Sequence, residues 1–147
     1  MITIDPPSPS FPAQQKSALS RFLNRARLAA GLRGEVEVLL TSDAEIKRLN
    51  RVFRGKNKPT DILSFPTPPE LAAQTAGDLA ISLDTAARQA AEHGHSLAVE
   101  IKILLLHGLL HLAGEDHETD HGQMAAREAT LRRQLKLPLS LIERARR

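Results

Sequence analysis

Three histidines at residues 107–117 have the types and spacing of metal ligands. His107 and His111 are four residues apart, and His117 follows six residues later. Side chains at positions i and i+4 of a helix project from the same face, so both imidazoles can reach one ion. Gly114 favours a left-handed backbone that ends the helix and turns the chain back. The pattern therefore predicts a metal site at the end of a helix, with these three histidines as its ligands.

The ligand set indicates a catalytic zinc ion. Three neutral imidazoles leave zinc its full positive charge and an open fourth position, which is typical of catalytic sites. Such an ion polarises a substrate oxygen and lowers the pKa of bound water to about 7. The alternative is a structural ion that only holds the loop after Gly114. Glu115 and Asp116 lie next to His117 in the sequence. Each of these carboxylates either orients an imidazole or is exposed to solvent, and Asp116 is also a candidate for proton transfer.

The same run has the histidine and glycine spacing of the metzincin protease motif, H-E-x-x-H-x-x-G-x-x-H. Metzincins use the glutamate after the first histidine as their general base, and this chain has Gly108 at that position. The ligand spacing is therefore kept, while the group that handles protons in the protease is missing. A zinc peptidase is an alternative function that Gly108 opposes. The other histidines, His93, His95 and His121, lack this spacing and are predicted to be surface residues.

The first two ligands belong to a segment that is apolar nearly all round, which predicts a buried helix. Ser96 is expected to cap this helix, which runs to Ala113. Alternating apolar residues predict strands at 2–4, 36–40, 62–65 and 79–83, and helical spacing predicts helices at 14–30, 42–55, 84–93, 96–113 and 120–138. Residues 66–77 are predicted to be a mobile loop. This order predicts an α+β fold in which helices pack on a small mixed β-sheet, with the metal site at the end of the buried helix.

Size and composition indicate one globular domain. The chain has 147 residues, of which 41% are hydrophobic and 25% charged, values that exclude a disordered, collagen-like or coiled-coil protein. A chain of this length can form a core without disulfides, and it has no cysteine. We expect a single domain over residues 1–147, with a proline-rich connector at 6–13 and a basic C-terminal tail at 138–147.

The most apolar segment, 97–114, contains charged residues and histidines, so no membrane span is expected, and the N-terminus lacks the features of a secretory signal. Cytoplasmic localisation is therefore expected.

Charge is strongly segregated along the chain. Residues 1–60 carry 11 Lys and Arg against 5 Asp and Glu, whereas residues 61–126 carry 2 against 10. The densest basic run consists of Lys47, Arg48, Arg51, Arg54, Lys56 and Lys58. It is either a solvated helix face followed by a charged loop, or a surface that binds a polyanion. Because the chain has no Trp or Tyr, nucleic-acid binding would depend on phosphates rather than on base stacking.

Three sequence blocks together resemble the YbeY family of bacterial rRNA maturation factors, which are zinc-dependent endoribonucleases. The family pattern H-G-x-L-H-L-x-G-[Y]-D-H is matched from His107 to His117, with Glu115 in place of the usual tyrosine. A second block, L-N-x-x-[YF]-R-G-K-x-K-P-T-D-V-L-S-F-P, is matched with one conservative change over residues 49–66. A third, G-D-I-x-I-S, is matched in the same way over residues 77–82. The resemblance covers about residues 35–137.

The resemblance implies a zincin-like fold and one zinc ion on His107, His111 and His117. It implies catalytic roles for Arg54 and His107, with Arg54 gripping a phosphate beside the metal. Lys56 and Lys58 would bind neighbouring phosphates of the RNA, or they merely keep the loop soluble. The implied activity is cleavage of single-stranded RNA in 16S rRNA precursors on the small ribosomal subunit, in ribosome biogenesis and quality control, with neither DNA nor a membrane as partner. A ribosome-assembly factor with a structural zinc and no catalysis is the remaining alternative.

Overall fold

A four-stranded mixed sheet lies at the centre of the computed structural model, which describes residues 1–7, 13–71 and 73–145. The strands are β1 (Ile2–Ile4), β2 (Glu35–Thr41), β3 (Ile62–Pro66) and β4 (Thr75–Ser82), in the spatial order β1-β2-β4-β3. Strands β1, β2 and β4 run parallel to one another, and β3 is antiparallel to β4 at one edge of the sheet. The predicted mixed sheet is therefore confirmed.

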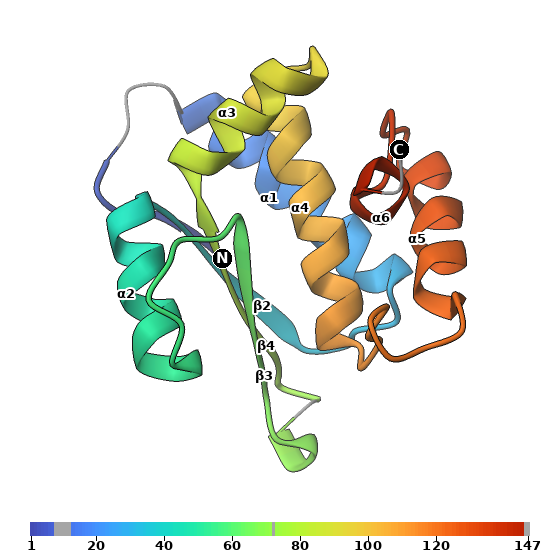
Figure 1. The fold of residues 1–147 in the computed structure, drawn as a ribbon. Coiled ribbons are helices and arrows are strands. Elements are labelled where there is room, and N and C mark those ends of the chain that lie inside the picture. Colours follow the sequence, from blue (N-terminus) through green and yellow to red (C-terminus); the bar gives the residue numbers. More distant parts are fainter. Residues whose placement is uncertain (8–12, 72, 146–147) are drawn as a thin grey trace.

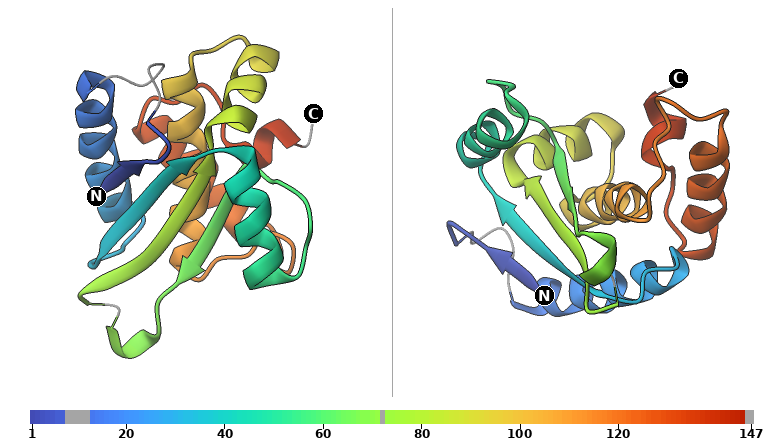
Figure 2. Two further views of the ribbon diagram at one scale, coloured as in Figure 1. Left: turned by 90° about the vertical axis from the view of Figure 1, so that its left-hand side faces the viewer. Right: turned by 90° about the horizontal axis from the view of Figure 1, so that it is seen from below.

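Helices cover both faces of this sheet. They are α1 (Ala13–Ala29), α2 (Asp43–Arg54), α3 (Leu83–His93), α4 (Leu97–Leu112), α5 (Gln123–Gln134) and α6 (Leu141–Ala145). Helices α1 and α4 lie on one face and α2 on the other, while α5 and α6 pack against the side of α4 that faces away from the sheet (Figures 1 and 2). This arrangement confirms the predicted α+β fold and places the apolar helix α4 between two layers.

Apolar side chains on the two faces of the sheet form two separate clusters. Side chains on one face of the sheet, including Val38, Leu79 and Ile81, join α1 and α4 in the main core. On the opposite face, Ala80 packs with Leu63 of β3 and other side chains in a smaller cluster beneath α2. Successive residues of a strand point to opposite faces, so β4 contributes to both clusters. The sheet consequently holds α4 and α2 at fixed positions on either side of it.

The predicted helix boundaries follow local capping signals. The Ser42 hydroxyl accepts a hydrogen bond from the Glu45 backbone N–H at 3.2 Å, and the Ser96 hydroxyl accepts one from Val99 N–H at 3.2 Å. Gly55 ends α2 with a φ of 69°, in the left-handed region. Gly55 thus fixes the end of α2 directly after Arg54, and Ser96 fixes the start of α4.

Two segments differ from the sequence prediction. Strand β4 begins at Thr75, inside the predicted loop, because it pairs with both β2 and β3 along this stretch, and the loop also contains a short 3-10 helix, η1 (Pro69–Leu71). Helix α6 forms within the predicted tail, where Ser140 accepts a hydrogen bond from Glu143 N–H and Ile142 is only 4% exposed. Residues 8–12 of the predicted connector and residues 146–147 of the predicted tail lie outside the described residues.

A buried ion pair attaches α6 to α4. Glu100 is fully buried and accepts two hydrogen bonds from the Arg144 guanidinium, at 2.6 and 2.8 Å. Its Oε1 also lies 2.7 Å from Nε2 of His95. The prediction that His95 is a surface residue is therefore wrong, since its side chain is only 15% exposed. The turn at Gly94 folds the chain so that this ring meets the first turn of α4.

Acid is expected to weaken this attachment. Burial raises the pKa of Glu100, but hydrogen bonds and charge from Arg144 and His95 outweigh it, so the pKa lies below its ordinary value of 4.5. A carboxyl whose folded-state pKa is depressed stabilises the fold above its unfolded pKa and loses that contribution as the pH falls through the folded pKa. We expect the free energy of unfolding to fall below pH 4.5 more steeply in the wild type than in Glu100→Gln. Urea titrations at several pH values measure this, and identical slopes would contradict it.

Among the described residues, no single helix has the length and apolar character to cross a membrane. Taken together, α3 and α4 have the length and composition of a membrane-spanning segment, but the two helices are bent by 110° at their junction.

Candidate metal centre

The three predicted ligands converge at the end of α4. Each histidine offers one nitrogen, and these three nitrogens lie within 4.8 Å of one another. His107 Nε2 and His111 Nε2 are 3.2 Å apart, because the two residues stand one above the other on the helix. Gly114, with a φ of 94°, turns the chain so that His117 comes back toward them. The residues are thus brought together in the way their spacing predicts.

A carboxylate from α5 fixes the orientation of the first ring. Glu128 is fully buried, and its Oε2 lies 2.7 Å from His107 Nδ1. The ring nitrogen donates to the carboxylate, so the other nitrogen, Nε2, carries the lone pair and faces the cluster. Glu128 was not predicted from the sequence. The detectable signal was a glutamate between Met124 and Leu131 on the inward face of α5, where an unpaired charge would be unfavourable.

The chemistry of the rings fits a bound metal. Burial and the neighbouring His107 lower the pKa of His111, which favours the neutral form that binds metals. His117 leaves a buried Nδ1 without a hydrogen-bond partner among the described residues. An unsatisfied buried nitrogen beside two other imidazoles is an unfavourable arrangement that an ion would relieve. Three neutral nitrogen donors with no protein carboxylate among them suit zinc and leave room for a further ligand.

A cavity of about 540 Å³ opens beside the histidines and includes Arg54. Its polar lining consists of Arg54, Thr60, Asp61, Ser64, His107, His111, Glu115, Asp116, His117 and Glu118. Arg54 is the last residue of α2, and its Nη2 donates to the Ser64 carbonyl oxygen of edge strand β3 at 3.0 Å. This contact leaves the other N–H groups of the guanidinium without a protein partner among the described residues. The structure therefore brings Arg54 and the three histidines into one cavity.

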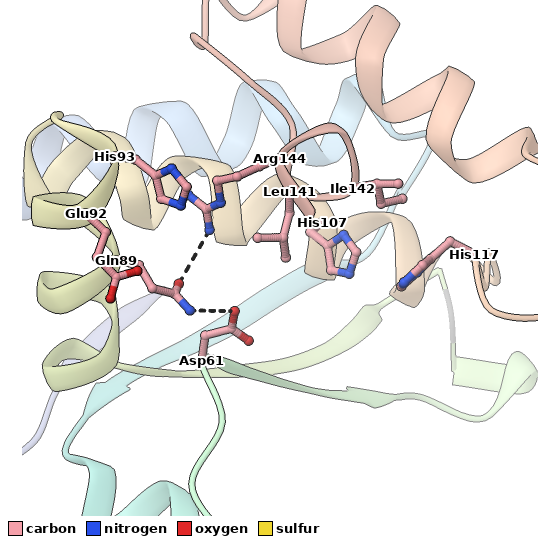
Figure 3. Close-up of a pocket in the computed structure, with 9 residues that line it drawn as sticks. All are labelled: Asp61, Gln89, Glu92, His93, His107, His117, Leu141, Ile142 and Arg144. Atoms are coloured by element: carbon pink, nitrogen blue, oxygen red, sulfur yellow. Dashed lines mark hydrogen bonds between the residues drawn. The ribbon is translucent and has the colours of Figure 1, made fainter. Parts of the chain in front are cut away.

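A second cavity, of about 470 Å³, extends from His107 and His117 toward α3 and α6 (Figure 3). His107, His117 and Asp61 line both cavities, and Asp61 was not predicted from the sequence as a site residue. Its Oδ1 accepts a hydrogen bond from the backbone of Ile62 at 2.8 Å, and its Oδ2 accepts one from Gln89 at 3.4 Å. Asp61 therefore adds a carboxyl group, held by two hydrogen bonds, to the cavities beside the histidines.

Similarity to known proteins extends over most of the chain. A family model described as endoribonuclease YbeY matches residues 6–136. The chain belongs to the YbeY family. Curated proteins named endoribonuclease YbeY include one from Koribacter versatilis, 58% identical over 129 residues that span 88% of this chain and 83% of the relative. Another, from Solibacter usitatus, is 48% identical over 130 residues, which span 88% of this chain and 86% of the relative. A Thermotoga maritima protein of known solution structure has a similar fold, with a TM-score of 0.62 and 28% identity over 92% of this chain and 89% of that one.

The two predicted RNA-binding lysines lie apart from the histidine cluster. Lys56 and Lys58 are exposed, and neither is among the described residues that line the histidine cavities. The loop that carries them is held by buried Asn50, whose side chain donates to the Lys58 carbonyl at 2.9 Å. The lysines consequently extend the basic surface beside Arg54 without entering the cavities.

Glu115, at the position of the usual YbeY tyrosine, has a structural partner. Its carboxylate pairs with Arg127 of α5 at 2.7 Å, and this arginine also donates to the Ala30 carbonyl at 2.6 Å. Asp116 is exposed, and its carboxylate accepts a hydrogen bond from Glu118 N–H at 3.0 Å. Neither carboxylate has a hydrogen bond to an imidazole. The hypothesis that Glu115 or Asp116 orients an imidazole ring is therefore not borne out. The orienting carboxylate is Glu128.

Gly108 allows α4 to pack closely on the sheet. A Cβ atom at this position would lie 2.7 Å from Ile62 Cδ1 and 2.8 Å from Leu79 Cδ2, both closer than real contacts permit. The metzincin glutamate would therefore point into apolar side chains of β3 and β4. The packing of this helix therefore disfavours a glutamate at position 108, because both side-chain ends would have to shift and the carboxylate would lie among apolar groups.

We expect Gly108→Glu to reduce the free energy of unfolding by at least about 3 kcal/mol, because it buries an unpaired charge and overpacks the core. Urea denaturation followed by circular dichroism measures this. The control, Ala91→Glu, places the same charge on an exposed position of α3 and should change stability by less than about 0.5 kcal/mol. A stable Gly108→Glu protein with peptidase activity would contradict the packing argument and favour the peptidase alternative.

Proposed function

We propose that this protein is a zinc-dependent endoribonuclease that cleaves single-stranded RNA at the centre formed by His107, His111 and His117. The observation that carries the proposal is the shared cavity, in which Arg54 from α2 lies together with the three histidines. Membership of the endoribonuclease YbeY family supports the choice of RNA over other phosphodiesters and over peptides. The two histidines on α4 and the turn at Gly114 support a zincin-like classification of the fold.

The protein groups have separate tasks in this proposal. Arg54 is anchored to β3 through one N–H, and its remaining N–H groups are oriented to hold the scissile phosphate by charge-assisted hydrogen bonds. Glu128 holds the His107 ring through Nδ1, so that Nε2 stays directed at the ion. A zinc ion on the three imidazoles supplies Lewis acidity toward a phosphoryl oxygen. Tight positioning by groups on rigid elements lowers the entropy cost of reaching the transition state.

The charge of the cavity makes the ion necessary for RNA binding as well. Arg54 is the one lysine or arginine among the described lining residues, whereas Asp61, Glu115, Asp116 and Glu118 are acidic. One guanidinium does not offset these carboxylates, and Glu115 is already paired with Arg127. A phosphate diester therefore enters this cavity favourably only when a divalent cation adds positive charge. Lys56 and Lys58 would attract neighbouring phosphates outside the cavity.

The biological substrate that we propose is the 16S rRNA precursor on the small ribosomal subunit, in the cytoplasm. Family membership supports this choice, together with the basic surface around α2 and the loop after it. Binding through phosphates is expected to weaken steeply as salt rises.

The test is cleavage of a labelled single-stranded RNA, with the same sequence in duplex form as the control. We expect cleavage of the single strand, loss of activity after chelation, and recovery when zinc is restored. Elemental analysis of the purified protein should give about one zinc per chain. A metal-free wild type, or activity that is insensitive to chelation, would overturn the zinc centre.

The two alternatives predict different outcomes in the same assay. A peptidase would cleave an unstructured peptide at a rate comparable to that on RNA. A ribosome-assembly factor with a structural ion would bind RNA with full affinity, contain zinc, and leave the RNA intact.

A further inference from the structure

Glu128 lies at the centre of a contact that no sequence motif indicates. Its side chain is fully buried between α4, α5 and α6, and each carboxylate oxygen has a different partner. Oε2 is 2.7 Å from His107 Nδ1, and Oε1 accepts a hydrogen bond from the Ile142 backbone N–H at 2.9 Å. A buried carboxylate is tolerated only when such partners compensate its lost hydration. The position of Glu128 is therefore fixed from both sides.

Helix α6 supplies one of these two partners, and it is held in place independently. Arg144 pairs with buried Glu100 of α4, and Glu143 pairs with Arg132 of α5 at 3.0 Å. The docked helix places Leu141 and Ile142 beside His107 in the wall of the second cavity (Figure 3). Residues 141–145 lie beyond the part of the chain that the family model matches, 6–136.

We infer that Glu128 is a positioning residue for the metal ligand His107 and that it couples the C-terminal helix α6 to the metal centre. The inference rests on the proposed function, since it requires a metal on the three histidines. The Nδ1 atom of His107 is paired with Glu128 at 2.7 Å, and its Nε2 lies 3.2 Å from His111 Nε2 within the cluster. The buried carboxylate is the partner that holds the ring from the side away from the cluster, so the orientation of the ring depends on Glu128. The position of Glu128 depends in turn on the Ile142 N–H. Metal binding and docking of α6 must then favour each other, because such coupling is reciprocal.

The first test measures metal affinity in Glu128→Gln by competition with a chromophoric chelator. Glutamine has the same shape, but its single carbonyl oxygen cannot accept hydrogen bonds from both His107 and Ile142, and its NH₂ group then faces a donor. We expect zinc to bind about 10- to 100-fold more weakly than to the wild type. The visible spectrum of the cobalt-substituted protein should also change, because the orientation of one ligand is altered.

The matched control is Asp43→Asn, which alters another carboxylate with several hydrogen bonds, far from the histidines. Asp43 accepts hydrogen bonds from the Thr85 hydroxyl at 2.6 Å and from Arg88 at 2.9 Å. A loss of general stability would affect both variants, whereas a positioning role affects zinc affinity and the cobalt spectrum in Glu128→Gln alone. Equal zinc affinity in Glu128→Gln and the wild type would overturn the inference and leave the proposed function intact. A wild type that binds no metal would overturn both.

A second measurement needs no variant and decides the matter if Glu128→Gln fails to fold. Hydrogen exchange of the Ile142 amide is compared in zinc-loaded and metal-free wild-type protein. Coupling predicts that zinc slows this exchange by about 10-fold or more, within the range of typical coupling energies. The amide of Val99, at the opposite end of α4, should change little because its partner is the Ser96 hydroxyl. Equal protection of Ile142 with and without zinc would overturn the coupling.

Discussion

Replacing His111 by alanine is expected to abolish stoichiometric zinc binding and to reduce RNA cleavage to background. The variant leaves only two imidazoles in the cluster. Loss of a residue that hydrogen-bonds to a ligand weakens metal binding by roughly 10- to 100-fold, so loss of a ligand itself should weaken zinc binding by more. His111 is the informative choice because His107 is paired with buried Glu128. Removing His107 would leave that carboxylate without one of its partners and destabilise the fold as well.

Three measurements check this prediction on the same preparation. Elemental analysis gives the zinc content, a labelled RNA gives the cleavage rate, and thermal unfolding with and without zinc gives the stabilisation that the ion contributes. We expect zinc to raise the Tm of the wild type and to leave that of His111→Ala unchanged, since ligand binding stabilises only the state that binds. His121→Ala, an exposed histidine outside the cluster, is the control and should resemble the wild type in all three. Full zinc content in His111→Ala would contradict the assigned ligand set.

Replacing Arg54 by alanine is expected to lower the cleavage rate by about 100- to 1,000-fold, the range found when one charge-stabilising donor is removed from an active site. Zinc binding should be unchanged, because Arg54 bonds to the Ser64 carbonyl and has no hydrogen bond to the histidines. The comparison of rate and zinc content therefore separates the arginine from the metal ligands. The measurement is single-turnover cleavage with saturating enzyme, which isolates the chemical step from RNA binding.

Two further variants test the reason for this effect. Arg54→Lys keeps the charge but loses the planar, bidentate geometry, so it should restore only a small part of the activity. Arg51→Ala removes an exposed charge from the same helix outside the cavity and should change cleavage by only a few-fold, mainly through weaker RNA binding at low salt. Equal losses in Arg51→Ala and Arg54→Ala would indicate a diffuse electrostatic role and contradict the phosphate contact.

Local sequence was sufficient to predict that the three histidines converge. The spacing of His107 and His111 specifies one face of a helix, and Gly114 specifies a left-handed turn that returns His117 to that face. These relations depend on backbone geometry within about three turns of chain, so they hold before any tertiary contact forms. The capping residues Ser42 and Ser96 and the strand alternation belong to the same class of local signal.

The partners of these ligands depend on tertiary structure. Glu128 reaches His107 only because α5 packs against α4, and no periodicity in the sequence pairs two residues 21 positions apart. The partial burial of His95 follows from its contact with buried Glu100, which Arg144 meets across 44 residues. Helix α6 is only five residues long, too short to be stable on its own, and it forms because buried contacts hold it. For that reason the sequence predicted a basic tail at 138–147 and not this helix.

By itself, the sequence determined which side chains are the candidates for chemistry and the order of most helices and strands, since both depend on residue type and short spacing. Packing decided which groups surround those side chains. It placed Arg54 in the histidine cavity, kept Lys56 and Lys58 outside it, and set Gly108, where a protease has its glutamate, against the apolar ends of Ile62 and Leu79. The physical reason is that burial, hydrogen-bond partners and close contacts are set between elements distant in the chain, and local spacing carries no information about them.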